Sequence, residues 1–137
     1  MANLSWIAVV VAALAGFIVG GLWYGPLFGK PWLASIGLTV EDGKKMNPAK
    51  VFGTSLVAQF IMAFCLAMFF YGDPAAADAI TASSGAFYGF LTGFGWVSMV
   101  ICVNSQFEFR SFNYIVITGS YWTVIFTLMG LVLGAWK

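Results

Sequence analysis

The segment at residues 51–72 reads VFGTSLVAQFIMAFCLAMFFYG and contains no charged side chain. Three further segments without a charge lie at residues 1–29, 79–107 and 111–136. A helix needs about 20 apolar residues to cross the hydrocarbon core of a bilayer, and each segment is at least that long. The sequence therefore predicts an all-α protein, a bundle of four transmembrane helices.

The composition supports a membrane protein and disfavours several other classes. Hydrophobic residues make up 61% of the 137 residues and charged residues only 8%, whereas an average soluble domain has about 25% charged residues. A net charge of +1 provides no basic surface for nucleic acid. The chain has no histidine, the commonest metal ligand and general base. We therefore expect no nucleic-acid partner, no cofactor, no metal site, no catalytic residues and no enzyme activity.

Proline and capping signals predict where the helices begin and end. Gly25 and Pro26 should end the first helix, because proline lacks a backbone donor and disfavours helix before it. Asn47 and Pro48 are typical of an N-cap followed by proline at the first helical position. We expect one membrane domain over residues 1–137, with helices at about 3–25, 48–72, 79–107 and 111–136 and a cytoplasmic loop at 26–47.

Two connections should contain structure of their own. A helix over residues 74–107 would be roughly 50 Å long at 1.5 Å per residue, which exceeds the bilayer core. We therefore expect residues 74–82 to stand outside the membrane or lie on its surface, with a bend near residues 83–85. Thr39 and Asp42 have the spacing of a capping box, so the first loop should hold a short interfacial helix.

The basic residues predict the orientation in the membrane. Those of the first and third loops are Lys30, Lys44, Lys45, Lys50 and Arg110. The opposite side has only Lys137. The positive-inside rule then places the first and third loops in the cytoplasm and both termini outside. We expect a multi-pass protein of a bacterial inner (plasma) membrane, in contact with membrane lipid.

Small residues recur at spacings of three and four along the predicted helices, so they share one helix face. In lipid no hydrophobic force draws helices together, and close backbone approach along small residues promotes packing. We predict packing contacts at Gly16, Gly20, Gly85, Gly89, Gly93, Gly130 and Gly134. Because exposed small stripes also favour self-association, we expect a homo-oligomer.

Gln59 is the most polar side chain lying well inside an apolar segment. Its amide needs hydrogen-bond partners in hydrocarbon, so it should face the interior of the bundle. It serves either as a clamp between helices or as a polar site on a path for a substrate or water. No ionisable group shares its depth, which disfavours a proton-coupled exporter.

Two clusters are expected at the cytoplasmic end. Residues 23–32 read WYGPLFGKPW, with four aromatic residues, two prolines, two glycines and a lysine. An aromatic belt at the membrane interface explains part of this pattern, although the segment is denser than anchoring requires. Glu108 and Arg110 flank Phe109 in the third loop. They either hold the turn or bind an anionic headgroup or solute.

At these residues the chain resembles a family of small bacterial four-helix membrane proteins, catalogued as domain of unknown function 1761. Residues 23–32 are similar to its motif Trp-Tyr-Gly-Pro-Leu-Phe-Gly-Lys-x-Trp. Further similar positions are Asn104, Phe107, Glu108, Arg110, Ser111, Gly119, Tyr121, Gly134, Ala135 and Trp136. The resemblance implies a compact bundle and no particular activity, substrate or cofactor.

Two classes of function remain open. The protein is either a homo-oligomeric channel or facilitator for a small solute, or a structural or accessory membrane protein that binds lipid or a larger partner. We favour the first class, because exposed small stripes favour self-association. The candidate pore or ligand residues are Trp23, Tyr24, Lys30, Trp32, Gln59, Asn104, Glu108, Arg110 and Tyr121.

Overall fold

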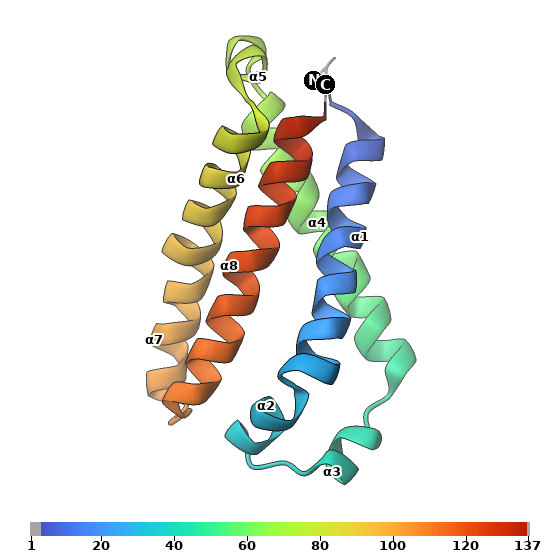
Figure 1. The fold of residues 1–137 in the computed structure, drawn as a ribbon, viewed down its shortest axis with the longest axis vertical. Helices are drawn as coiled ribbons and strands as arrows, with labels where there is room; N and C mark the ends of the chain where they lie inside the picture. Colours follow the sequence, from blue (N-terminus) through green and yellow to red (C-terminus); the bar gives the residue numbers. More distant parts are fainter. Residues whose placement is uncertain (1–3, 137) are drawn as a thin grey trace.

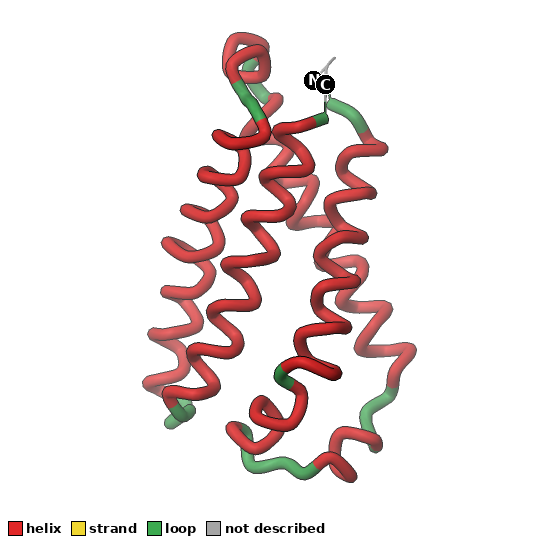
Figure 2. The backbone as a smooth tube through the Cα atoms, viewed as in Figure 1, coloured by secondary structure: helices red, strands yellow, loops and turns green. Residues whose placement is uncertain are grey.

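The computed structural model describes residues 4–136, which form helices joined by short loops (Figure 1, Figure 2). The start of the first helix expected at residue 3 lies outside these residues. No strand occurs among the residues described. The helices long and apolar enough to cross a membrane are Trp6–Leu27, Pro48–Tyr71, Ala82–Phe107 and Phe112–Ala135. The chain is therefore all-α, a four-transmembrane-helix bundle, as the sequence predicts.

Two of these spans, the first and the third, are composed of more than one helical element. In chain order the elements are α1 (Trp6–Leu22), the π-helix η1 (Trp23–Leu27), α2 (Gly29–Ser35), α3 (Val40–Lys44), α4 (Pro48–Tyr71), α5 (Pro74–Ala79), α6 (Ala82–Phe90), the π-helix η2 (Leu91–Ser98), α7 (Met99–Phe107) and α8 (Phe112–Ala135). The elements α6, η2 and α7 follow one another without a gap and form the third span.

The first span ends in a kink where the sequence predicted a simple stop. After Leu22 the chain widens into η1, which continues through Pro26. Gly25 has φ −103° and ψ −105°, outside the helical region, so the kink lies there. The indole of Trp23 donates to the carbonyl oxygen of Ile117 in α8 at 3.0 Å. This tertiary contact anchors the wider turn to α8, and α2 begins beyond it.

The break before the third span lies earlier in the chain than expected. The helix α5 ends at Ala79, and the break lies at Ile80 and Thr81 instead of near residues 83–85. The backbone N–H of Thr81 donates to Ser84 Oγ at 2.9 Å. The backbone N–H of Ser84 donates to Thr81 Oγ1 at 3.3 Å. This reciprocal cap satisfies the free donors of a new helix, which explains why α6 begins there.

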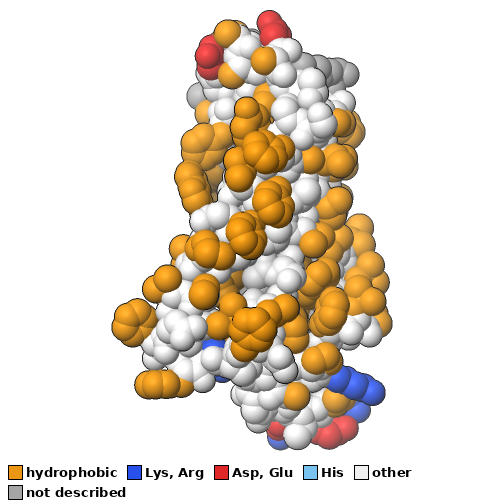
Figure 3. All heavy atoms as spheres, turned by 60° about the vertical axis from the view of Figure 1, so that its left-hand side comes forward, with side chains coloured by type: hydrophobic (Ala, Val, Ile, Leu, Met, Phe, Trp, Pro, Cys, Tyr) orange, Lys and Arg blue, Asp and Glu red, His pale blue; other side chains and the backbone are white. Residues whose placement is uncertain are grey.

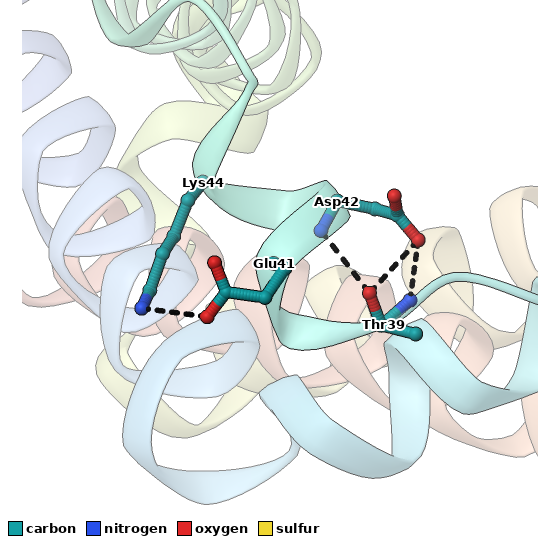
Figure 4. A network of polar contacts seen from close by, with 4 residues as sticks. All are labelled: Thr39, Glu41, Asp42 and Lys44. Atoms are coloured by element: carbon teal, nitrogen blue, oxygen red, sulfur yellow. Dashed lines mark hydrogen bonds and ion pairs between the residues drawn. The ribbon is translucent and has the colours of Figure 1, made fainter.

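The first loop contains the capping box that the sequence predicts (Figure 4). Thr39 donates to the Asp42 carboxylate through both its backbone N–H and its hydroxyl, each at 2.9 Å. These hydrogen bonds hold the pKa of Asp42 below its usual range, with the backbone bond the larger cause. Lys44 pairs with Glu41 at 3.1 Å. The short helix α3 is therefore fixed by local contacts at the end of the bundle.

Glycines bring the third and fourth spans together. A Cβ atom at Gly85 would overlap the carbonyl oxygen of Gly130, and one at Gly89 would overlap that of Phe126. A Cβ at Gly93 would lie 2.7 Å from the carbonyl oxygen of Trp122. Gly130 and Gly134 approach the backbone of α6 and its cap in the same way. These small-residue stripes therefore face each other within one chain.

The surface of the bundle matches a lipid environment. Figure 3 shows apolar side chains over the middle of the molecule, acidic side chains near one end, and basic together with acidic side chains near the other. Phe69 is 73% exposed and Trp96 is 66% exposed. Large apolar side chains in water would be unfavourable, whereas in a bilayer they are solvated by the lipid tails.

Phe109, in the turn between α7 and α8, allows a test of this backbone. Its φ is 56° and its side chain is 95% exposed. Phe109→Gly should be more stable than Phe109→Ala by about 1 kcal/mol, because only glycine adopts this left-handed conformation without a steric cost. The stability of the two variants is compared by thermal unfolding in the same detergent. Both lack the phenyl ring, so only the backbone preference differs. A more stable alanine variant would contradict this backbone conformation.

Candidate functional site

A cavity of about 640 Å³ lies between α1, α4 and α8, toward the end that carries α2 and α3. Figure 1 shows α1 and α8 diverging at this end. Phe17 and Gly20 of α1, Phe52 of α4 and Trp122 of α8 contribute to its wall. Cavities of this size, mainly apolar with a few polar groups, are typical of sites for small molecules. The cavity is therefore the candidate site.

A polar pair lies at the inner end of the cavity. Gln59 is 2% exposed and Tyr121 is 5% exposed. Gln59 Nε2 donates to the Tyr121 hydroxyl at 2.9 Å. Gln59 Oε1 is buried, and no donor among residues 4–136 reaches it. Turning the amide over would exchange its two polar atoms and still leave one of them unpaired. An unpaired buried polar atom costs about 1–3 kcal/mol.

Two glycines of α1 make room for this pair. A Cβ at Gly16 would lie 2.5 Å from Gln59 Oε1, and one at Gly20 would lie 2.7 Å from the Tyr121 hydroxyl. The sequence predicts both glycines as positions of helix packing. In the structure they accommodate polar side chains from α4 and α8, so α1 can approach both helices without excluding the amide or the phenol.

Aromatic rings from the segment 23–32 close one side of the cavity. The Tyr24 ring packs edge-on against Trp32 at 5.0 Å between centroids and against Tyr121 at 4.9 Å. The Trp23 ring lies 6.2 Å from that of Tyr121. The structure thus brings together five residues that the sequence analysis singled out. They are Trp23, Tyr24, Trp32, Gln59 and Tyr121.

Trp23 packs beside the cavity without lining it, and the remaining candidate residues do not line it either. Lys30 is exposed on α2, and Asn104 is exposed on α7. Arg110 Nε lies 3.6 Å from Glu108 Oε2, and its guanidinium lies 5.3 Å from the centre of the Tyr114 ring. These contacts lie at the turn between α7 and α8, and both interpretations of Glu108 and Arg110 stay predictions.

Lys50 lines the cavity and was not singled out from the sequence as a site residue. A signal was present, since Lys50 follows the Asn47–Pro48 start of a helix by only two positions. A cation is unfavourable at that end, where the helix dipole is positive. An unexpected charge at a helix start can therefore identify a functional position. Phe17, Phe52 and Trp122 gave no comparable signal.

The bundle is closed beyond Gln59. Fully buried apolar side chains fill the space between this polar pair and the end where α5 lies (Figure 1). The apolar residues with no exposed surface include Val9, Ala12, Ile125, Met129 and Leu133. Within this chain the cavity therefore ends near Gln59 and does not continue to the other side.

Comparison with known proteins identifies a family but indicates no activity. Residues 7–134 match the model of a family described as "Protein of unknown function (DUF1761)". Comparisons with curated proteins and with solved structures found no match. The function must therefore be argued from the cavity and its lining.

Proposed function

The chain belongs to the DUF1761 family, and on that premise we propose that it is a membrane protein that binds a small, largely apolar molecule in the cavity beside Gln59. The unpaired Oε1 of Gln59, at the inner end of the cavity, carries this proposal. A buried polar atom without a partner calls for an explanation, and a bound donor supplies one. The ligand would provide the hydrogen bond that the chain does not.

The lining limits the chemistry of this molecule. Aromatic side chains such as Phe17, Tyr24 and Phe52 offer apolar contact, and no aspartate or glutamate lines the cavity. A ligand of mainly apolar character with one hydrogen-bond donor fits these walls. It gains affinity in two ways, because it leaves water and because it satisfies an acceptor that is unpaired in the free protein.

The structure provides less support for a homo-oligomeric channel. That hypothesis relied on small-residue stripes being free for self-association, but Gly85 and Gly89 approach Gly130 and Phe126 of the same chain. A pore along the bundle would also have to open the apolar layer around Ile125 and Met129. We therefore place ligand or lipid binding first, and solute transport and oligomerisation remain predictions.

A double replacement tests the role of the polar pair. Tyr121→Phe alone should destabilise the protein by about 1–3 kcal/mol, because it leaves both polar atoms of the Gln59 amide unpaired. Gln59→Leu alone should have a smaller effect, because it leaves the Tyr121 hydroxyl unpaired but also removes the unpaired Oε1. The double variant should regain most of this stability, since both polar partners are gone. It should nevertheless bind a donor-carrying ligand, such as a medium-chain alcohol, more weakly than the wild type does. Thermal unfolding with and without the alcohol measures both effects.

Equal alcohol binding by the wild type and the double variant would contradict a role for Gln59 in recognition. The matched control is Thr54→Val, which removes a hydroxyl from the cavity wall farther from the polar pair. This variant should change the shift caused by the alcohol much less than the double variant does.

We also propose that the protein spans the inner (plasma) membrane with both termini outside. The basic residues of the first loop lie at the end of the bundle that carries α2 and α3. Asp73 caps α5 and Asp78 lies within it, at the opposite end (Figure 1). The start of α1 and the end of α8 lie on the side of α5 (Figure 1). This arrangement supports the orientation from the positive-inside rule. Lys137, which entered that argument, lies outside the described residues.

Cysteine labelling tests this orientation. In a background without the native cysteines (Cys65→Ala, Cys102→Ala), Ala75→Cys should react with an impermeant thiol reagent in intact spheroplasts. Lys44→Cys should react only after the membrane is permeabilised. Ala75 and Lys44 are both exposed in the structure, so their access to the reagent depends on the side of the membrane on which they lie. The reverse pattern would invert the proposed topology.

A further inference from the structure

We infer that the ligand of this cavity is an amphipathic anion, whose acidic head binds at Lys50 and whose apolar body extends toward Gln59. This inference rests on the proposed function, because it names the ligand class for the same cavity. It adds a second anchoring point, at the mouth, to the hydrogen bond proposed at the inner end.

Lys50 is a cation without a partner at the cavity wall. Its neighbours in the first loop are neutralised, since Lys44 pairs with Glu41 at 3.1 Å and Lys45 with Asp42 at 3.8 Å. Lys50 forms no ion pair among residues 4–136. No carboxylate lines the cavity either. An acidic group on a bound molecule is therefore the complement that this wall lacks.

The start of α4 strengthens the attraction for an anion. This helix has 24 residues, and its first turn contains no acidic side chain. The N-terminus of a helix has a partial positive charge, which an aspartate or glutamate usually balances. Here Lys50 adds a further positive charge at the same place. A bound anion would relieve this repulsion and interact with both the lysine and the helix dipole.

The distance between the two anchoring points sets the length of the ligand. Lys50 and Gln59 stand nine positions apart on α4, which corresponds to about 13 Å along the helix axis. Between them Phe52, Phe17 and Trp122 provide an apolar wall. A medium-length hydrocarbon chain spans such a distance. The acid ω-hydroxydodecanoate combines a carboxylate, a chain of this kind and a terminal hydroxyl donor.

Two sources could supply this chemistry. One is a free amphipathic carboxylate, and the other is a membrane lipid with an anionic headgroup. Both place a negative charge at the level of Lys50 and a hydrocarbon chain beside it. The shared chemistry is the inference, and competition between the two distinguishes the source.

The experiment uses the full chain in nanodiscs of phosphatidylcholine. Binding of radiolabelled ω-hydroxydodecanoate is measured by equilibrium dialysis, with empty nanodiscs as the blank. Lys50→Gln should weaken binding about tenfold, because a charge pair at a partly apolar wall is worth more than one in water. Lys30→Gln is the matched control, because Lys30 of α2 is, like Lys50, an exposed lysine at this end of the bundle, but it does not line the cavity. It should leave the affinity within about twofold, as surface charges usually do.

The outcomes separate this inference from the proposed function. The diol of the same length should bind wild type and Lys50→Gln equally, because it has no acidic head. If Lys50→Gln and Lys30→Gln weaken acid binding to the same extent, the head does not bind at Lys50 and the inference fails, although the cavity still binds the diol. If neither the acid nor the diol binds above the blank, the proposed function fails as well.

A last arm identifies the source of the anion. Phosphatidylglycerol introduced into the nanodiscs should displace the labelled acid if the natural head is that of a lipid. Undiminished acid binding would identify a free amphipathic acid. Either result supports the inference only if Lys50→Gln abolishes the difference in affinity between the acid and the diol.

Discussion

Gly89→Leu is expected to destabilise the protein by about 3 kcal/mol or more and to separate the third and fourth spans. A Cβ at this position would overlap the carbonyl oxygen of Phe126 and lie 2.8 Å from its carbonyl carbon. It would also lie 3.2 Å from the Cα of Thr127. All three atoms belong to the backbone of α8, so no change of rotamer relieves the overlap. The two helices must move apart, which removes the packing that holds them together in lipid.

Gly95→Leu is the matched control for this experiment. Gly95 lies in the same span, but a Cβ there would meet no atom within 4 Å. Its side chain would face the surrounding lipid or detergent, and we expect a change within about 0.5 kcal/mol. Thermal unfolding in detergent and gel filtration measure stability and oligomeric state. If both leucine variants unfold like the wild type, the third and fourth spans do not pack through this face.

The glycines of the third span also show what the sequence could and could not predict. The spacing of Gly85, Gly89 and Gly93 indicates a helix face suited to close approach, because such residues align every turn. The same pattern fits a neighbouring helix, a second copy of the chain or a lipid. Only the fold determines that α8 occupies the face. The expectation of self-association rested on such stripes, and it stays a prediction.

Local signals predicted the helix starts well, whereas a tertiary contact fixes the kink after Leu22. Asn47 caps α4 and Thr39 caps α3, as short-range spacing indicates. The sequence offered a local signal for the break at Ile80, the capping spacing of Thr81 and Ser84, which was not used. It offered none for the wide turn after Leu22. This turn depends on Trp23 reaching the carbonyl oxygen of Ile117, 94 positions away in the chain. Periodicity in one segment contains no information on such a contact.

The candidate site was predicted in part for similar reasons. Gln59 is conspicuous in the sequence because an amide in hydrocarbon needs a partner. Its partner, Tyr121, entered through the resemblance to a family, and no spacing rule connects the two positions. Lys50 was counted only as a topological signal, since loops near membranes commonly contain lysines. Its place at the cavity wall follows from how α1 and α8 diverge beside α4.

Ala58→Trp is expected to reduce ligand affinity by about a hundredfold or more. Ala58 lines the cavity one position before Gln59, and its small side chain leaves the wall open. An indole at this position would occupy the space that the ligand's chain requires, because packed interiors tolerate little overlap. The neighbouring Val57 is 60% exposed and does not line the cavity. Val57→Trp should therefore bind the ligand normally, although it adds the same side chain to the same helix.

The same two variants test whether the cavity belongs to a transport path. Ligand binding is measured in nanodiscs, and ligand flux is measured in liposomes for wild type, Ala58→Trp and Val57→Trp. Our proposal expects that wild type binds without accelerating flux, because Val9, Ile125 and Met129 close the bundle beyond Gln59. Wild-type flux that Ala58→Trp abolishes would instead make the protein a facilitator, with this cavity as its entrance and a mobile apolar layer behind it. Equal binding by the two tryptophan variants would show that the ligand does not occupy the cavity at all.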